Sequence, residues 1–164
     1  MQSDAPLEWK FLVPVSAGML LRFWAGAYLG PHGNSAQAQA PLLQRGGPYR
    51  FSRNPLYLSN ILVGAGLVLF AHCLPVWLEV FACLLLIVHH ALLVTWEEKT
   101  LHMQWGEAYA RYARETPRWI GRRGDAPPGN ENAAQWEKVR AWQGRNLAYA
   151  VLCVLLLWGA ARWG

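Results

Sequence analysis

Two short polar segments of this 164-residue chain hold side chains that could do chemistry, and each one borders a strongly apolar run. The first, RGGPYRFSRNPLYLSN at residues 45–60, combines three arginines, two tyrosines and two prolines. Guanidinium groups bind carboxylates and phosphates, and aromatic faces attract cations. The prolines prevent a continuous helix, which leaves backbone N–H and C=O groups in need of partners. This segment therefore concentrates groups that could bind a polar ligand, although its arginines could also serve only to orient the chain in a membrane.

The second segment, residues 87–120, carries His89 and His90 and, after them, the adjacent carboxylates of Glu97 and Glu98. On a helix, His90, Val94 and Glu97 fall nearly on one face, so ionisable groups lead from an apolar stretch to the glutamate pair. Ionisable groups at membrane depth are candidates for function. Two simpler interpretations stay open. His89 and His90 could be hydrogen-bonding partners between helices, and the glutamates a solvated pair neutralised by arginine.

The elements that position these groups are expected to be membrane helices. The chain is 54% hydrophobic and only 15% charged, against about 25% charged residues in ordinary soluble domains. Residues 7–29 are long enough to cross a hydrocarbon core of about 30 Å, and residues 56–96 are long enough for two crossings with a break at 71–75. Residues 142–163 form a fourth candidate. A cleaved signal peptide is the alternative for the first run.

A further helix is expected after the third crossing. Leu101, Trp105, Tyr109 and Tyr112 recur at helical spacing, which predicts an amphipathic helix that ends at Pro117. This helix would lie on the membrane or fold back over the bundle. The predicted fold is therefore an all-α, polytopic membrane helix bundle with about four transmembrane helices and one cytoplasmic amphipathic helix, in a single domain over residues 1–164.

The distribution of positive charge predicts the orientation. Lysines and arginines gather at residues 45–53 and 99–145, whereas the 71–75 turn has none, so both basic segments should face the cytoplasm. The net charge of +5 then reflects membrane topology, and the basic residues could also contact anionic lipid headgroups. No motif in the sequence indicates nucleic-acid binding. A bacterial inner membrane is the expected location.

The remaining segments are assigned no chemistry. Residues 30–41 and 121–135 are rich in small and polar residues, which predicts loops. Cys73, Cys83 and Cys153 lie in or beside apolar runs without metal-ligand spacing, so they are expected to pack, and neither a metal site nor a disulfide is predicted.

Three motifs in order resemble the family of isoprenylcysteine carboxyl methyltransferases and phospholipid methyltransferases. They are GPYRFSRNPLY at residues 47–57, EEKTLHMQWGEAYARY at 97–112 and TPRWI at 116–120, within a core motif region of residues 45–120. The resemblance implies an S-adenosylmethionine site that faces the cytoplasm. It also implies a fold other than the Rossmann fold, and the chain has no GxGxxG motif. An additional helix, residues 142–163, follows the last motif.

The resemblance also assigns residues. Arg53, Asn54, Pro55 and Tyr57 match the family's Arg-His-Pro-x-Tyr element, and Glu97 and Glu98 match its paired glutamates. Asn54 stands where a histidine is common, so no general base is available at that position. The expected cofactor-binding residues are Tyr49, Arg50, Arg53, Asn54, Pro55, Tyr57, Glu97 and Glu98. The expected catalytic residues are His90, Glu97 and Arg53.

The chemistry of S-adenosylmethionine agrees with these residue types. An arginine, either Arg50 or Arg53, would pair with its carboxylate, and a glutamate would accept from its ammonium or its ribose. A tyrosine would hold the adenine or approach the sulfonium. The methyl acceptor would be a lipophilic or lipid-linked molecule, either a carboxylate like that of isoprenylcysteine or an amine like that of a phospholipid. The alternatives are a membrane reductase that uses a nicotinamide cofactor and a non-catalytic membrane scaffold.

Overall fold

The computed structural model describes residues 9–30, 43–72, 74–121 and 134–163, and every regular element in these ranges is helical. The elements are the 3-10 helix η1 (Trp9–Phe11), α1 (Leu12–Leu29), the 3-10 helix η4 (Gly47–Arg50), α2 (Pro55–Ala71), α3 (Val76–Glu115) and α4 (Trp136–Trp163). The all-α prediction is thus confirmed for the described residues. The two predicted loops, residues 30–41 and 121–135, lie mostly outside the described residues. Cys73 lies outside them as well.

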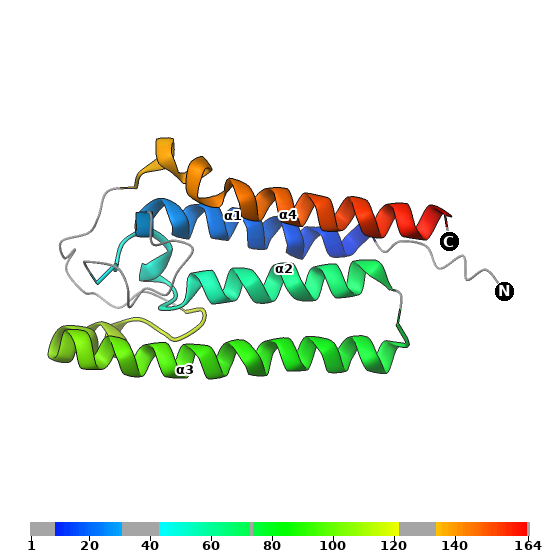
Figure 1. Cartoon of the computed structure of the whole chain (residues 1–164). Helices are drawn as coiled ribbons and strands as arrows, with labels where there is room; N and C mark the ends of the chain where they lie inside the picture. The colour runs from blue at the N-terminus through cyan, green and yellow to red at the C-terminus, as the bar shows by residue number, and fades with distance from the viewer. Residues whose placement is uncertain (1–8, 31–42, 73, 122–133, 164) are drawn as a thin grey trace.

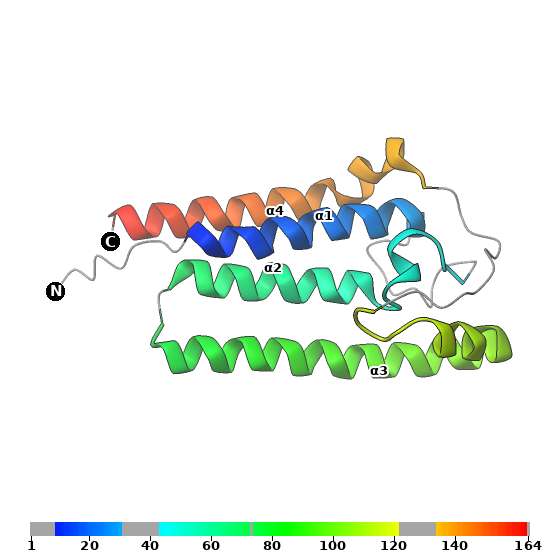
Figure 2. The same ribbon diagram turned by 180° about the vertical axis from the view of Figure 1, so that it is seen from behind.

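The four α-helices run side by side, with α1 packed against both α2 and α4, and α3 packed against α2 (Figure 1). One end of the bundle holds the start of α1, the end of α2, the start of α3 and the end of α4. The opposite end holds η4, the residues that follow it and the last part of α3, as the view from behind also shows (Figure 2). The two polar segments of the sequence therefore meet at one end of the bundle.

Small residues let α1 and α2 approach closely. A Cβ atom on Gly18 would lie 2.8 Å from Val63 Cγ2, and one on Gly66 would lie 2.7 Å from Val15 Cγ2. Close contact at glycine is a common way for helices to associate where lipid replaces water. The α1–α2 pair therefore forms a tight unit on which the polar end is built.

Two of the described helices, α1 and α3, are long and apolar enough to cross a membrane, and α2 is apolar but shorter. The N-terminal half of α3 exposes a row of large apolar side chains, among them Trp77, Phe81, Leu85 and Leu92. Helix α4 begins at Trp136, six residues before the predicted start at 142. Four crossings were predicted, and length and hydropathy support two of them.

The α2–α3 hairpin has its break where the sequence predicts it. Helix α2 ends at Ala71, His72 adopts a left-handed conformation with φ of 41°, and Pro75 caps the start of α3. A proline suits a helix start because its missing N–H has no partner there in any case.

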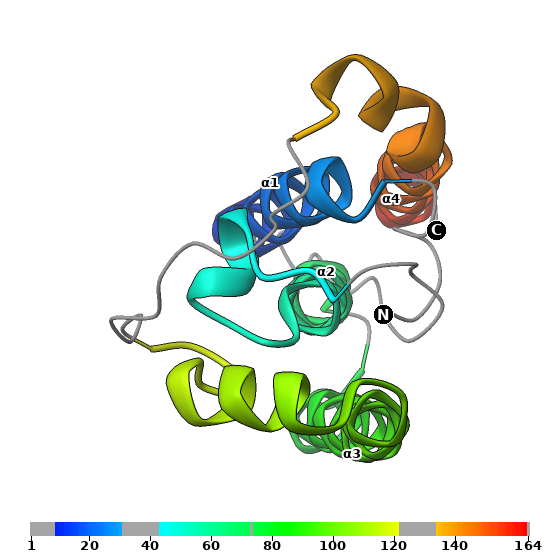
Figure 3. The same cartoon turned by 90° about the vertical axis from the view of Figure 1, so that its left-hand side faces the viewer.

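Helix α3 changes direction at Gly106, whose φ of 48° and ψ of −123° are not helical. Seen from the polar end, the last part of α3 runs across the axis of the helix before it (Figure 3). Its Tyr109 and Tyr112 are buried with Leu101 and Leu43. Of the two predicted placements for the amphipathic helix, the structure has the one folded back on the protein. Glu115 is its last residue, two before Pro117.

Candidate functional site

Proline sets the local structure of the segment between α1 and α2. Pro48 lies in the first turn of η4, and Phe51 N–H donates to the Pro48 carbonyl at 3.0 Å, which closes this short turn. Pro55 is the first residue of α2, where its missing N–H costs little. Residues 51–54 therefore stay irregular, and their polar groups are available for tertiary contacts.

The chain after α3 satisfies several of these polar groups. Arg53 N–H donates to the Pro117 carbonyl at 3.0 Å, and Gly121 N–H donates to the Phe51 carbonyl at 3.1 Å. The Tyr112 hydroxyl donates to the Tyr49 carbonyl at 2.8 Å. The motif around residues 116–120 thus lies along residues 51–54. All three motifs of the sequence form one structural unit.

Glu98 lies at the centre of this unit. Arg118 donates to Glu98 Oε2 from Nη2 at 2.6 Å and from Nε at 3.0 Å. Asn54 Nδ2 donates to Glu98 Oε1 at 3.0 Å, and Arg53 Nη1 lies 3.5 Å from the same oxygen. Two guanidinium groups share one carboxylate, so these three charged side chains together keep a net positive charge. We call these four residues, Arg53, Asn54, Glu98 and Arg118, the Glu98 cluster.

Arg53, Asn54 and Glu98 are predicted site residues, and the structure brings Arg53 and Asn54 into contact with Glu98. It adds Arg118, which the sequence reasoning did not assign to the site. Arg118 lies 20 residues after Glu98 and beyond the end of α3, so helical spacing could not connect them. The only sequence signal was its place within the TPRWI motif. Asn54 also donates to the Arg118 carbonyl at 3.1 Å, which gives this asparagine a positioning role.

Glu97 faces a different set of groups, because neighbouring residues on a helix point about 100° apart. It is only 2% exposed, and the Tyr57 hydroxyl forms a hydrogen bond with it. Burial raises the pKa of the Tyr49 hydroxyl well above its usual range, nearby Glu97 raises it further, and Arg22 opposes the increase. This hydroxyl has no hydrogen-bond partner among the described atoms. A buried carboxylate and an unsatisfied hydroxyl thus lie close together.

His90 lies deeper in the bundle on the same buried face of α3. His90, Val94 and Glu97 are all buried, which confirms the predicted column. His90 Nδ1 is 2.9 Å from the Leu86 carbonyl oxygen, and its ring lies edge-on to Tyr57 at 6.0 Å between ring centroids. When Nδ1 donates to that carbonyl, Nε2 is left as an acceptor. Tyr57 therefore lies between His90 and Glu97.

An open cavity of about 560 Å³ adjoins the Glu98 cluster. Glu98, Arg118 and Tyr109 line it together with residues that the sequence reasoning did not select: Thr95, Lys99, His102 and Met103. Burial raises the pKa of Tyr109 to about 12, Glu98 contributes to the increase, and Arg53 opposes it. The cavity therefore has a polar wall with both signs of charge. Arg50, also a predicted ligand, is half-buried at the end of η4.

A comparison with protein families identifies the chain. The family model described as phospholipid methyltransferase matches residues 12–108. The chain belongs to this family. The match spans α1, the 45–57 segment, α2 and the Glu97–Glu98 pair, and it stops before Arg118 and α4. No curated protein and no solved structure matches the chain.

Membership of the phospholipid methyltransferase family confirms the resemblance that the three motifs suggested. It supports transfer of a methyl group to a lipid-like acceptor. The matched region also contains every residue that the sequence reasoning assigned to the site. The geometry around Glu97 and Glu98 can therefore be interpreted in terms of methyl transfer.

Proposed function

We propose that this protein is an integral membrane methyltransferase that uses S-adenosylmethionine and modifies a lipid-linked acceptor. The observation that carries the proposal is the Glu98 cluster, which holds two guanidinium groups on one buried carboxylate beside an open cavity. The family match favours a phospholipid amine as acceptor over an isoprenylcysteine carboxylate.

The residues around the cavity fit this cofactor. The net positive charge of Arg53, Arg118 and Glu98 suits the carboxylate of S-adenosylmethionine, and Arg53 Nε is buried with no hydrogen-bond partner among the described atoms. Tyr109 lines the cavity, where its aromatic ring would attract the sulfonium. The cofactor would supply an electrophilic methyl group. Arg50, Pro55 and the two tyrosines of the first motif would complete its surroundings.

Glu97 is the best placed base for an amine acceptor. A protonated amine must lose a proton before its nitrogen can attack, and an acceptor carboxylate needs no such step. Glu97 is buried and hydrogen-bonded to Tyr57, whose ring lies against His90. In this arrangement Glu97 takes the proton and Tyr57 orients the carboxylate. His90 is the second candidate base, and burial of the whole column excludes competing water.

The proposed topology has four crossings with the Glu98 cluster on the cytoplasmic side. The exposed apolar row on α3 needs lipid to cover it, because soluble proteins rarely expose large contiguous apolar patches. The start of α1, the α2–α3 turn and the end of α4 share one end of the bundle, as four crossings require. Arg45, Arg50, Arg53, Arg111, Arg114 and Arg118 lie at the other end, which the positive-inside rule assigns to the cytoplasm, whereas Arg162 near the end of α4 does not.

Calorimetric binding of S-adenosylhomocysteine to the purified protein in detergent tests the proposal. We expect saturable binding that Glu98→Gln weakens at least tenfold, because charge-assisted hydrogen bonds contribute about 1.5–3 kcal/mol each. Glu107→Gln is the matched control, since Glu107 forms an exposed ion pair with Arg114 at 2.8 Å, and it should bind normally. No binding by a folded sample would refute the proposal. A response to NADPH instead would favour a reductase.

A further inference from the structure

Helix α4 lies beyond the region that the family model matches, yet it sends one polar side chain, Gln143, into the bundle. This side chain is fully buried, and a Cβ atom on Gly26 of α1 would lie 2.8 Å from its Nε2 atom. A larger residue at position 26 would therefore displace the amide. Just before α4, Gln135 N–H donates to the Ala27 carbonyl in the last turn of α1 at 2.8 Å. The polar end of α1 thus anchors α4.

The amide of Gln143 holds the guanidinium group of Arg22. Arg22 Nε donates to Gln143 Oε1 at 3.0 Å, and the same oxygen accepts from Asn146 Nδ2 at 2.8 Å. Arg22 Nη1 donates to Asn60 Oδ1, on α2, at 2.5 Å. Side chains from two other helices therefore fix the orientation of this arginine, because the planar guanidinium offers its donors in a rigid geometry.

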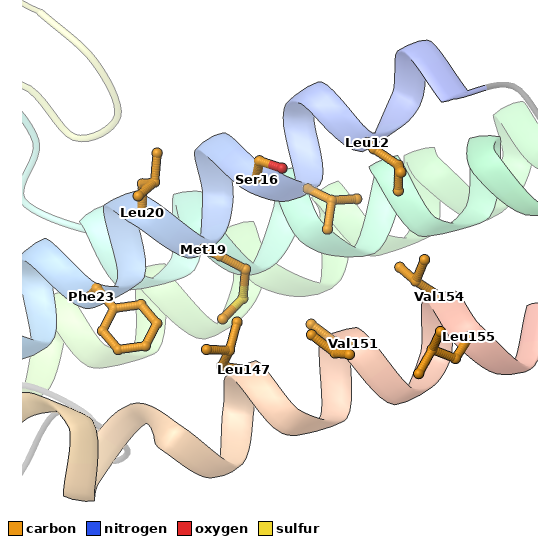
Figure 4. A pocket seen from close by; sticks show the side chains of 11 residues that line it. Leu12, Ser16, Met19, Leu20, Phe23, Leu147, Val151, Val154 and Leu155 are labelled. Carbon is orange, nitrogen blue, oxygen red and sulfur yellow. The ribbon is translucent and has the colours of Figure 1, made fainter.

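Farther along α1 and α4, an apolar groove of about 530 Å³ separates the two helices. It begins one turn after Gln143, where Leu147 faces Met19 of α1 (Figure 4). Ser16 is the one polar side chain among the described residues that line it. Apolar contacts have little directionality. The placement of α4 against α1 therefore depends on the polar contacts around Gln143.

Arg22 lies on the face of α1 that covers the candidate active site. Arg22, Ala25 and Leu29 share this face by helical spacing, and Tyr49 packs against Ala25 and Leu29. The buried Tyr49 hydroxyl responds to two charges, because nearby Glu97 raises its pKa and Arg22 lowers it. A cation on α1 and a carboxylate on α3 thus act on the same phenol.

We propose that Gln143 is a positioning residue of the active site, which holds the Arg22 guanidinium where its charge acts on Tyr49 and on the neighbouring Glu97. Helix α4 is then part of the catalytic unit and more than a helix that completes the bundle. The catalytic part of this inference rests on the proposed function, in which Glu97 takes a proton from the acceptor. A cation held near a buried carboxylate favours the charged form, which is the form that a base requires.

Titration of a fluorinated tyrosine at position 49 tests this coupling without cofactor or acceptor. Trifluorotyrosine is close to tyrosine in size, its phenol ionises at much lower pH, and fluorine NMR of the protein in detergent follows its pKa. We expect Arg22→Gln to raise this pKa by about one unit, because a nearby cation favours the phenolate. Gln143→Met keeps the length of the side chain but removes the acceptor oxygen, and it should produce at least half of that rise.

Two further variants make the titration decisive. Val139→Ala loosens the buried packing of α4 one turn before Gln143 and leaves the amide in place, so this pKa should not change. Arg22→Lys keeps the charge but loses the two-point hold, so the pKa should rise less than in Arg22→Gln, and this variant gives the test if Gln143→Met does not fold. A pKa unchanged by Gln143→Met, or raised equally by Val139→Ala, would overturn the inference.

Enzyme kinetics separate this inference from the proposed function. With methyl-labelled S-adenosylmethionine and a lipid extract of the expression host, we expect Gln143→Met to lower kcat about fivefold or more and to leave KM for S-adenosylmethionine within about twofold, because the Glu98 cluster is intact. Normal S-adenosylhomocysteine binding with an unchanged kcat would overturn the catalytic role of Gln143 and leave the methyltransferase standing. The expected titration without S-adenosylhomocysteine binding would support the electrostatic role of Gln143 and count against the methyltransferase alone.

Discussion

Two adjacent glutamates have different environments, and this difference organises the site. Glu98 is bound by Arg118, Asn54 and Arg53, so its carboxylate holds cationic groups in position around the cavity. Glu97 is deeper and bonded to Tyr57. A rotation of about 100° around the helix, which is one step along the sequence, therefore separates a positioning carboxylate from a candidate base.

Arg118 gives the sharpest prediction at this scale. We expect Arg118→Ala to weaken S-adenosylhomocysteine binding at least tenfold, because it removes a two-point charged contact that shapes the cavity wall. Calorimetry measures this change. Arg114→Ala, which breaks only an exposed ion pair, should change affinity less than twofold. Similar losses in the two variants would show that Arg118 acts through general charge.

At the scale of elements, the direction of the last part of α3 depends on Gly106. Its φ of 48° lies where residues other than glycine are strained, and a Cβ there would meet no atom within 4 Å. The cost of substitution is therefore conformational and not steric. The turn brings Tyr112 onto the Tyr49 carbonyl and the 116–121 segment onto residues 51–54.

Gly106→Ala should therefore lower the free energy of unfolding by about 1–3 kcal/mol, the range for a strained residue. Gly144→Ala is the control, because Gly144 also has open space around it but is helical within α4. There alanine should be neutral or stabilise by up to about 1 kcal/mol. Thermal denaturation in detergent compares the two. A Gly106→Ala protein as stable as Gly144→Ala would show that the bend in α3 does not require glycine at position 106.

At the scale of the whole molecule, most of the positive charge lies at one end of the bundle, which is the polar end. The α2–α3 turn lies at one end, and the Glu98 cluster lies at the other. Most arginines and lysines lie at the polar end, so the proposed membrane orientation and the proposed site depend on the same charges. In the proposed function, a cofactor from the cytoplasm and a lipid from the bilayer would then meet near Glu97 and Glu98.

This topology predicts which cysteines a membrane-impermeant maleimide can reach in a background without the native cysteines. Leu74→Cys, at the partly exposed α2–α3 turn, should react in intact spheroplasts of an expression host. Arg111→Cys, exposed after the Gly106 break, should react only after permeabilisation. The reverse pattern would invert the proposed orientation.

The sequence alone determined the features that depend on local patterning. Apolar length and proline positions located the α2–α3 break, helical spacing placed His90, Val94 and Glu97 on one buried face, and the order of three motifs indicated the family. These features follow from the periods of secondary structure and from the types of residue, which act over a few neighbouring positions.

Only the tertiary structure decided what those elements bring together. Arg118 reaches Glu98 because α3 bends at Gly106, and Arg22 reaches Gln143 across 121 positions of sequence because α1 packs on α4. Contacts at such separations depend on how the helices pack, and helical periodicity carries no information about which faces meet. The cavity beside Glu98 and the groove between α1 and α4 are products of that packing.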